Sequence, residues 1–119
     1  MIIKDANVTV MVNEMDRAVE FYINTLGLKL KGRYGDEFAQ VEAAGMTIGL
    51  HPANKNGPKP GDSGSLSIGF GVDSLDKAMV ELKSRGVKFS QILDDNQVML
   101  AFFTDPDGNP LYLSETKWG

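Results

Sequence analysis

The chain of 119 residues contains no cysteine. Disulfide bonds, thiolate nucleophiles and cysteine-ligated zinc or iron–sulfur sites are therefore excluded. No apolar run approaches the roughly 18 residues that a membrane span requires. The N-terminal segment reaches Lys4 and Asp5 too early for the apolar core of a secretory signal. These absences predict a cytoplasmic protein that does not enter a membrane.

Positive charge is also scarce. Twelve Lys and Arg residues stand against sixteen Asp and Glu residues, which gives a formal net charge of −4, and the basic residues form no block. Nucleic-acid binding depends on Lys and Arg neutralising phosphates, so we expect no nucleic-acid partner. The length suits one compact domain, which would bury about two-thirds of its unfolded surface.

What the chain does contain is an internal repeat. Residues 8–30 read VTVMVNEMDRAVEFYINTLGLKL and predict a strand, a helix and a second strand. Residues 66–89 read LSIGFGVDSLDKAMVELKSRGVKF and predict the same order. Val72 stands 60 positions after Val12, about half the chain length, and the same shift pairs Ala18 with Ala78. The repeat divides the protein into two similar modules.

The first module, about residues 1–51, is expected to hold one helix and four strands. The strands are predicted at residues 7–12, 29–34, 38–42 and 47–51, and the helix opens at Asn13-Glu14. Gly27 is placed to end the helix in the left-handed conformation. Helical spacing predicts a buried stripe of Met15, Ala18, Val19, Tyr22, Ile23 and Leu26.

Residues 52–64, PANKNGPKPGDSG, hold three of the five prolines and no large apolar side chain. This composition predicts a linker, with a mobile cover over a site as the alternative. The second module, about residues 65–119, completes a single domain of residues 1–119.

The second module is expected to repeat the order of the first. Its strands are predicted at residues 66–72, 87–93, 98–104 and 111–114. In the first of these strands, Leu66 is expected to face the helix. Its helix is expected to start at an N-cap Ser74, to end at Gly86, and to bury Leu75, Ala78, Met79 and Leu82. Asp105-Pro106-Asp107-Gly108 has the sequence of a type I turn.

The predicted fold class is α+β. Two tandem βαβββ modules would form a mixed eight-stranded, half-open barrel, or cup, with the helices outside. In both first strands the face opposite the helix is small or polar: Asn7, Thr9 and Met11 in one copy, and Ser65, Ser67 and Gly69 in the other. Small residues would leave empty volume there, so the cup is the expected ligand site.

Three segments resemble the vicinal oxygen chelate superfamily: VNEMDRAVEFYINTLGLKL, SIGFGVDSLDKAMVELKSRGVKF and FFTDPDGNPLYLSE. That superfamily includes glyoxalase I, extradiol dioxygenases, fosfomycin-resistance enzymes and bleomycin-resistance proteins. The resemblance covers nearly the whole chain and implies the fold described above. It leaves the function open, because one scaffold supports both catalysis and plain binding.

The resemblance also implies where a metal ion would be held, at inward positions of the first, fourth, fifth and eighth strands. In this chain those positions are Asn7, Gly49, Ser67 and Tyr112, none of which is a histidine or a carboxylate. A divalent cation needs several strong nitrogen or oxygen donors. His51, the only histidine, lies two residues beyond Gly49, about 6–7 Å along a strand.

Other acidic residues do not replace that set. Glu115 is three residues past Tyr112 and would point to the other side of its strand. Asp105 and Asp107 precede a glycine at the fourth position of their loop, whereas an EF-hand loop requires it at the sixth. We therefore predict no metal and no cofactor.

The residues expected to line the cup suit a flat organic ligand. Phe102 and Tyr112 would stack on it, and Gln40 or Ser67 would orient it. The alternative is that these side chains pack against one another or against a second subunit. The full predicted ligand-binding set is Asn7, Thr9, Met11, Phe38, Gln40, Gly49, His51, Ser67, Phe102 and Tyr112.

Two functions remain open at this point. The preferred hypothesis is a metal-independent glyoxalase- or bleomycin-resistance-like homodimer that binds a small organic molecule, with drug sequestration as one version. The alternative is a divalent-metal-dependent lyase, isomerase or dioxygenase of the glyoxalase type, or an enzyme that uses His51 and Tyr112 as acid and base. A third reading is a remnant with only an interaction role. Trp118 is expected over the cup, at a dimer seam or in a disordered end.

Overall fold

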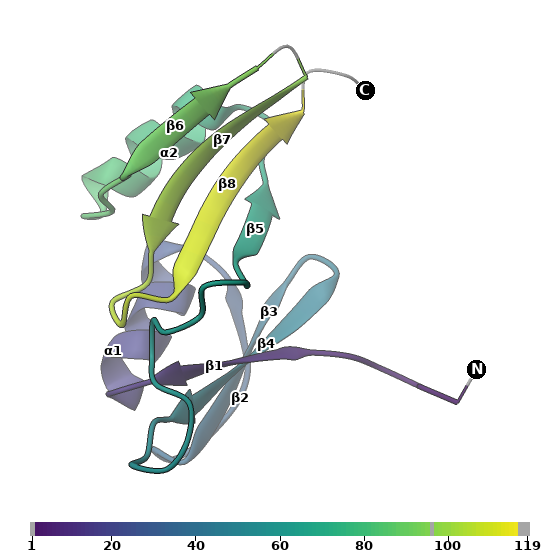
Figure 1. Ribbon diagram of the computed structural model, residues 1–119, viewed down its shortest axis with the longest axis vertical. Helices are drawn as coiled ribbons and strands as arrows, with labels where there is room; N and C mark the ends of the chain where they lie inside the picture. Colours follow the sequence, from purple (N-terminus) through teal and green to yellow (C-terminus); the bar gives the residue numbers. More distant parts are fainter. Residues whose placement is uncertain (1, 96, 117–119) are drawn as a thin grey trace. The chain divides into compact units, whose positions relative to one another are not determined.

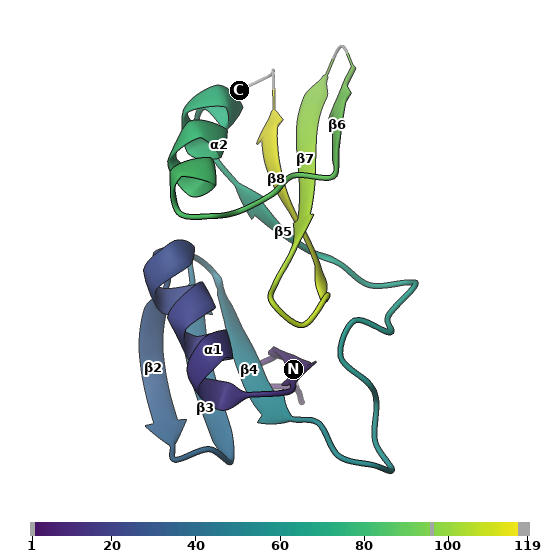
Figure 2. The ribbon, with the colours of Figure 1, turned by 90° about the vertical axis from the view of Figure 1, so that its left-hand side faces the viewer.

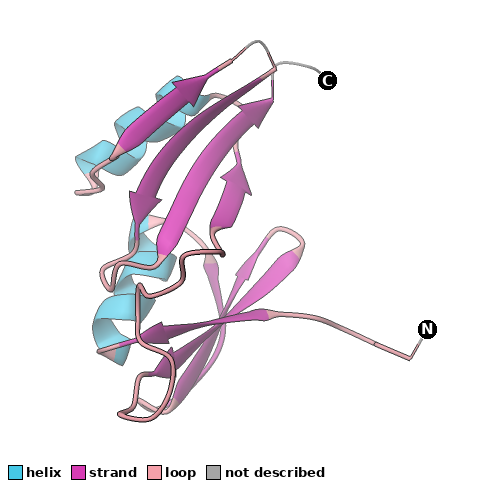
Figure 3. Cartoon of the chain, viewed as in Figure 1, coloured by secondary structure: helices cyan, strands magenta, loops and turns pink. Residues whose placement is uncertain are grey.

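The computed structural model describes residues 2–95 and 97–116. The chain divides into two compact units, one ending at Asp62 and the other beginning at Ser63. Each unit contains one four-stranded sheet and one main helix (Figures 1 and 3). Among the described residues, no helix has the length and apolar character needed to cross a membrane. Trp118 lies outside the described residues.

The first unit has the predicted order of one strand, one helix and three strands. It comprises β1 (Val8–Val12), α1 (Met15–Glu20) with the π-helical turn η1 (Phe21–Thr25), β2 (Lys29–Tyr34), β3 (Phe38–Ala43) and β4 (Met46–Pro52). The strands lie in the order β1-β4-β3-β2, with β1 parallel to β4 and the other pairs antiparallel. Because α1 contacts β3 and β4, it covers one face of this sheet.

The second unit repeats this arrangement. It comprises β5 (Ile68–Gly71), α2 (Leu75–Ser84), β6 (Gln91–Asp94), β7 (Val98–Thr104) and β8 (Pro110–Thr116), with strand order β5-β8-β7-β6. Figure 2 shows α2 along one face of this sheet, where it contacts β7 and β8. The predicted α+β class with tandem βαβββ modules is confirmed.

The duplication extends to the strand register. Val8 of β1 pairs with Ile48 of β4, and Ile68, 60 positions after Val8, pairs with Leu111 of β8. The antiparallel pair β3–β4 likewise repeats in β7–β8. A one-residue slip would turn every side chain of a strand to the other face. The two modules therefore present equivalent positions on equivalent faces.

Each unit has its own apolar core between the helix and the sheet. The buried sheet residues are Val12, Ala39, Val41, Ile48 and Leu50 in the first unit and Ile68, Ala101, Phe103, Leu111 and Leu113 in the second. Alternation along the first strand predicts Val8, Val10 and Val12 on the face toward the helix, and this is confirmed only at the end of the strand, since Val12 is buried while Val8 is 37% exposed. Within residues 2–95 and 97–116, the opposite face of each sheet carries no helix of its own unit, and we call it the helix-free face.

The predicted buried stripe of the first helix is only partly correct. Met15, Ala18 and Tyr22 are buried, and so is Phe21, which helical spacing did not select. Val19, Ile23 and Leu26 are half-buried. The physical reason is η1, in which the N–H of Leu26 donates to the carbonyl of Phe21 at 2.9 Å, five residues back. The wider π turn rotates the residues that follow it relative to an α-helix.

Both helices end at the predicted glycines, Gly27 (φ 80°) and Gly86 (φ 95°). Two strand boundaries were predicted wrongly. The strand expected from Val87 begins only at Gln91, because the N–H of Val87 donates to the carbonyl of Leu82 and closes α2. Leu66, expected to face the core, lies before β5 and is 71% exposed.

The start of α2 is capped from two directions. The Ser74 hydroxyl accepts a hydrogen bond from the N–H of Lys77 at 3.3 Å, which confirms the predicted N-cap. The Glu115 carboxylate, on β8, accepts from the N–H of Leu75 at 2.6 Å. Glu115 thus faces the helix, on the side of the sheet opposite Tyr112 as predicted, and places a negative charge at the positive end of the helix.

In the first unit, an ion pair joins β2 to α1. The Arg33 guanidinium donates to the Asp16 carboxylate at 2.6 Å and to the Asp36 carboxylate at 3.0 Å. The hydrogen bond that Arg33 donates to Asp16 is the main cause that raises the pKa of Arg33, so this side chain stays cationic.

Candidate functional site

The helix-free face of the first sheet gathers six of the predicted site residues. Thr9 pairs with Gly49, which also pairs with Gln40, and Met11 pairs with His51. Paired residues of neighbouring strands point to the same face. The six are Thr9 and Met11 on β1, Phe38 and Gln40 on β3, and Gly49 and His51 on β4.

Gly49 lies beneath other side chains of this face. A Cβ atom at this position would stand 2.9 Å from Oγ1 of Thr9 and 3.1 Å from Cζ of Phe38. Such distances are shorter than ordinary contacts, so the Phe38 ring lies close against the strand because residue 49 has no side chain. Gly49 is buried, while Phe38 and Gln40 are half-buried.

His51 stands at the exposed end of the same face. Its ring centroid is 6.3 Å from that of Phe38, at an angle of 61°. Its Nδ1 lies 2.9 Å from the carbonyl oxygen of Pro52. Because a carbonyl oxygen only accepts, Nδ1 must donate, and in the neutral imidazole Nε2 then carries the lone pair. In its neutral form His51 therefore has its proton acceptor at Nε2.

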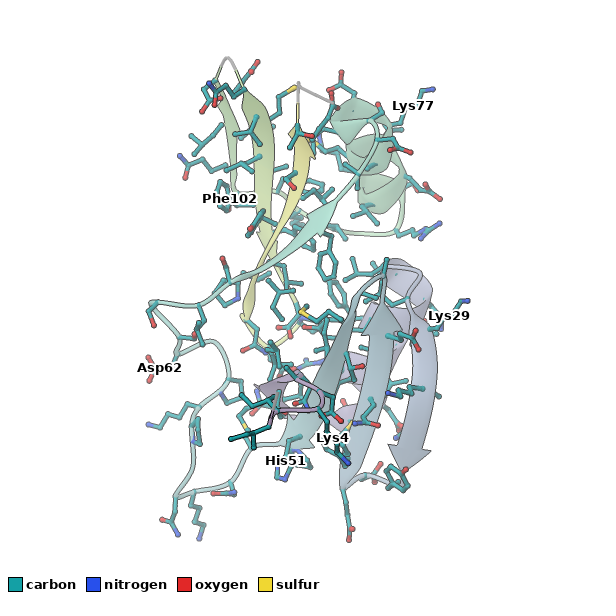
Figure 4. All side chains as sticks on the ribbon, turned by 90° about the vertical axis from the view of Figure 1, so that its right-hand side faces the viewer. Lys4, Lys29, His51, Asp62, Lys77 and Phe102 are labelled. Atoms are coloured by element: carbon teal, nitrogen blue, oxygen red, sulfur yellow. The ribbon has the colours of Figure 1, made fainter. Side chains whose placement is uncertain are left out.

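The helix-free face of the second sheet holds two predicted aromatic residues side by side. Gly69, Tyr112 and Phe102 form one row across β5, β8 and β7. The ring centroids of Phe102 and Tyr112 are 5.9 Å apart with an interplanar angle of 43°. Figure 4 shows Phe102 on the side of the sheet away from α2. Both rings are half-buried, so part of each is open to solvent.

The Tyr112 ring lies over Gly69. A Cβ atom at residue 69 would come within 2.5 Å of the Tyr112 hydroxyl oxygen and nearer still to its ring carbons. The expectation that the small residues of this strand leave empty volume is therefore wrong at Gly69, because the tyrosine ring fills that space. At Gly71, two positions along, a Cβ atom would meet nothing within 4 Å.

The structure does not bring Asn7 and Ser67 into these rows. Asn7 precedes β1 and Ser67 precedes β5, and both are exposed. Sequence reasoning named Phe38, Gly49, Gly69 and Tyr112 but did not anticipate that a ring covers a glycine in each module. The available signal was an aromatic residue directly opposite a glycine on the neighbouring strand, as Tyr112 is to Gly69, or diagonal to it, as Phe38 is to Gly49. Such aromatic–glycine neighbours are a recurrent stabilising arrangement in sheets.

The four positions at which the family resemblance places a metal do not suit a cation in this structure. Gly49 offers no donor and is covered, Tyr112 rests on Gly69, and Asn7 and Ser67 are neutral and lie outside the strands. Within residues 2–95 and 97–116, no three His, Cys, Asp or Glu side chains form a group that could hold a metal ion.

The hydrogen-bonding groups of the DPDGN segment, residues 105–109, are used within its own turn. The N–H of Gly108 donates to the carbonyl of Asp105 at 3.0 Å, as predicted for a type I turn. The carboxylate of Asp105 accepts from the backbone N–H groups of Asp107 and Asn109 at 2.9 Å, and from the Asn109 side chain at 2.8 Å. Asp105 is buried, and its carboxylate organises the loop between β7 and β8.

Known proteins share the fold described above. Residues 6–113 match the model of the family described as Glyoxalase/Bleomycin resistance protein/Dioxygenase superfamily. The antibiotic-binding protein TnmS3 from Streptomyces sp. CB03234 is 27% identical, with a TM-score of 0.78 over 98% of this chain and 99% of that one. A superfamily member from Sphaerobacter thermophilus DSM 20745 is also 27% identical, with a TM-score of 0.78 over 97% and 99%.

A curated relative matches over a shorter stretch. The Uncharacterized protein YaeR of Escherichia coli (strain K12) is 41% identical over 59 residues, which cover 48% of this chain. The match spans 46% of the length of YaeR.

Proposed function

This chain belongs to the glyoxalase/bleomycin resistance protein/dioxygenase superfamily, and we propose that it binds a small, planar organic molecule without the help of a metal ion. The observation that supports this proposal most directly is the pair Phe102 and Tyr112 on the helix-free face of the second sheet. Half-buried aromatic rings offer large apolar contact area at low entropic cost, and the tyrosine adds a hydroxyl that can orient a ligand.

The first sheet supports the same reading with a similar mixture of groups. Phe38 supplies an aromatic surface, and Gln40 and Thr9 supply polar groups on the same face. A ligand with an aromatic body and polar substituents would match such groups. TnmS3, which is antibiotic-binding, makes a drug-like compound a concrete candidate, and sequestration of that compound a concrete role.

One observation favours a second function, acid–base catalysis on a bound compound. The hydrogen bond from Nδ1 of His51 to Pro52 leaves Nε2 of the neutral ring as an acceptor. A single exposed histidine is also a common rim residue. Replacing His51 with alanine distinguishes a rim residue from a catalytic one. If the protein only binds its ligand, the His51→Ala variant keeps the affinity within about twofold. If the protein is an enzyme, the variant loses turnover of a ligand that it still binds.

The proposal is tested with a thermal-shift screen of aromatic and cationic compounds, followed by calorimetric titration of each hit. A true ligand at 100 times its dissociation constant adds about 2.7 kcal/mol to the free energy of unfolding. We expect Phe102→Ala to weaken binding of a hit about tenfold or more, since it removes a stacking surface. Val80→Ala, which trims a 70% exposed apolar side chain on α2, is the matched control and should change nothing.

Two results contradict this function. One is a screen in which no planar compound shifts the melting temperature. The other is a set of hits that Phe102→Ala and Val80→Ala affect equally, which would place binding elsewhere.

A further inference from the structure

The segment between β4 and β5, residues 53–67, contains the one asparagine of the chain that is followed by a glycine. Of the seven asparagines in the sequence, only Asn56 has such a neighbour, Gly57. This segment, which we call the connector, runs as a long loop without helix or strand (Figure 2). An asparagine before a glycine can react with its own backbone, because the glycine has no side chain that shields its nitrogen.

The surroundings of Asn56 leave both reacting groups open. Asn56 is exposed and lies in a turn after the last strand of the first unit. Its backbone N–H donates to Oδ1 of Asn54 at 3.0 Å, whereas its carboxamide has no hydrogen-bond partner among the described residues. The N–H of Gly57 donates to the carbonyl of Asn54 at 3.4 Å, which is longer than an ordinary hydrogen bond. Neither the carboxamide nor the glycine nitrogen is therefore held by a strong contact.

A second sequence of this kind is held in place by its turn. Asp107 precedes Gly108, and an aspartate can form the same ring with a following glycine. The N–H of Gly108 donates to the carbonyl of Asp105 at 3.0 Å, and the residue has a φ of 85°. Asp107 is half-buried, and its N–H donates to the Asp105 carboxylate at 2.9 Å. The fold restrains this pair and leaves the pair in the connector open.

We propose that Asn56 is a modification site, at which the chain converts its own asparagine to aspartate and isoaspartate. The nitrogen of Gly57 attacks Cγ of Asn56, the bond from Cγ to Nδ2 breaks, and the proton of the Gly57 N–H leaves with Nδ2 as ammonia. The product is a cyclic succinimide. Water then opens one of two C–N bonds of the ring. Opening at Cγ gives aspartate, and opening at the backbone carbonyl carbon gives isoaspartate.

The modification changes the connector and leaves the two cores intact. Each product carries a carboxylate that is ionised at neutral pH, which adds one negative charge to the formal net charge of −4. Isoaspartate also lengthens the backbone, because the chain then runs through the side-chain carbon. Asn56 is exposed and lies in no helix or strand, so no core contact is lost. The modified chain should stay folded.

Timed incubation at mildly alkaline pH, followed by peptide mapping with fragment-ion sequencing, tests the site. Asn56 should gain the mass expected when an amide NH2 becomes OH, and the rate should rise with pH because the attacking nitrogen must lose its proton. Labelling by a carboxyl methyltransferase that recognises isoaspartate should identify that product.

Asn54 is the internal control, because it is exposed and lies in the same turn. It precedes Lys55, whose side chain shields the backbone nitrogen, and its Oδ1 already accepts the N–H of Asn56. We expect the Asn54 amide to be lost about tenfold more slowly than that of Asn56, or slower still.

Gly57→Ala tests the role of the glycine. A Cβ atom at residue 57 would stand 3.1 Å from Oδ1 of Asn54, the end of a flexible side chain, and the backbone there is not left-handed. The variant should therefore fold, which a melting curve checks, and should lose the Asn56 amide about tenfold more slowly. Unfolding the wild-type chain in urea should change its rate by less than about threefold, because the folded connector does not restrain the site.

Four results overturn the proposal. The first is a wild-type chain in which Asn56 keeps its amide throughout the incubation. The second is an Asn54 that reacts as fast as Asn56, and the third is a folded Gly57→Ala variant that reacts as fast as the wild type. The fourth is a reaction that proceeds only in urea, because folding would then protect Asn56.

Discussion

At the scale of single residues, the feature that distinguishes both sheets is an aromatic ring resting on a glycine. Phe38 lies against Gly49 in the first sheet, and Tyr112 lies over Gly69 in the second. A glycine weakens a strand by itself, because it has no side chain to pack. The ring replaces that missing contact and is in turn held in one place, which is what a stacking surface for a ligand requires.

We predict that Gly69→Ala destabilises the protein. The new methyl group would come within 2.5 Å of the Tyr112 hydroxyl oxygen and nearer to the ring, so the ring must move. Overpacking of this kind costs about 1–3 kcal/mol in the free energy of unfolding, which urea denaturation measures. The same variant should also weaken any ligand that stacks on Tyr112.

Gly71→Ala is the matched control, because residue 71 lies on the same strand and face. A Cβ atom there meets nothing within 4 Å, and the backbone of Gly71 is not left-handed. We expect a change of less than about 0.5 kcal/mol in the free energy of unfolding, as for ordinary surface substitutions. Equal losses for the two variants would show that the Tyr112 ring is not the cause.

The sequence predicted which residues share the helix-free faces better than it predicted what they do there. Alternation along each strand placed Thr9, Met11, Gln40 and Phe102 on the correct faces, because side-chain period is a local property. It could not show that the Tyr112 ring lies over Gly69. That contact joins residues 43 positions apart and depends on the register of a parallel strand pair.

At the scale of elements, the second helix depends on a contact from the end of the chain. The Glu115 carboxylate accepts the N–H of Leu75, a backbone donor that has no partner within the helix. The hydrogen bond is charge-assisted and lies at the positive end of the helix dipole. It therefore joins β8 to the start of α2.

We predict that Glu115→Ala lowers the free energy of unfolding by about 1–2 kcal/mol, the usual cost of losing a helix cap. Glu115→Gln keeps an acceptor oxygen but loses the charge, and should cost roughly half as much. Glu81→Ala on the same helix is the control. It removes an exposed pair with Arg85 and should cost less than about 0.5 kcal/mol. A Glu115→Ala loss as small as that of the control would argue against the cap.

The sequence predicted the helix ends, which depend on local residue patterns, and missed the π turn, which does not. The glycines at both helix ends and the Ser74 cap follow from the chemistry of single residues. The π turn at Phe21–Thr25 has no such local marker, because neither glycine nor proline interrupts FYINT. Its effect is the burial of Phe21 beside Tyr22, with ring centroids 5.3 Å apart.

At the scale of the whole molecule, the two halves share strand order and register but carry different side chains at equivalent positions. Gly49 of β4 corresponds to Tyr112 of β8, and Thr9 of β1 corresponds to Gly69 of β5. The repeat could be recognised in the sequence because both modules retain the spacing between the helix and the glycine that ends it. The side chains that differ between the halves determine the chemistry, and the positions that would bind a metal hold no histidine or carboxylate.

This difference leads to a prediction about metal removal. After dialysis against Zn²⁺, Ni²⁺, Mn²⁺ and Fe²⁺ and then against buffer, elemental analysis should find well under one equivalent of metal per chain. A chelator should leave the melting temperature unchanged, because a cation that binds only the folded state would add stability by mass action. Gly49 and Tyr112 offer no carboxylate or imidazole donor, and His51 alone provides too few ligands for a four- to six-coordinate ion. Retention of one equivalent, with a chelator-sensitive melting temperature, would instead favour the metal-dependent lyase, isomerase or dioxygenase.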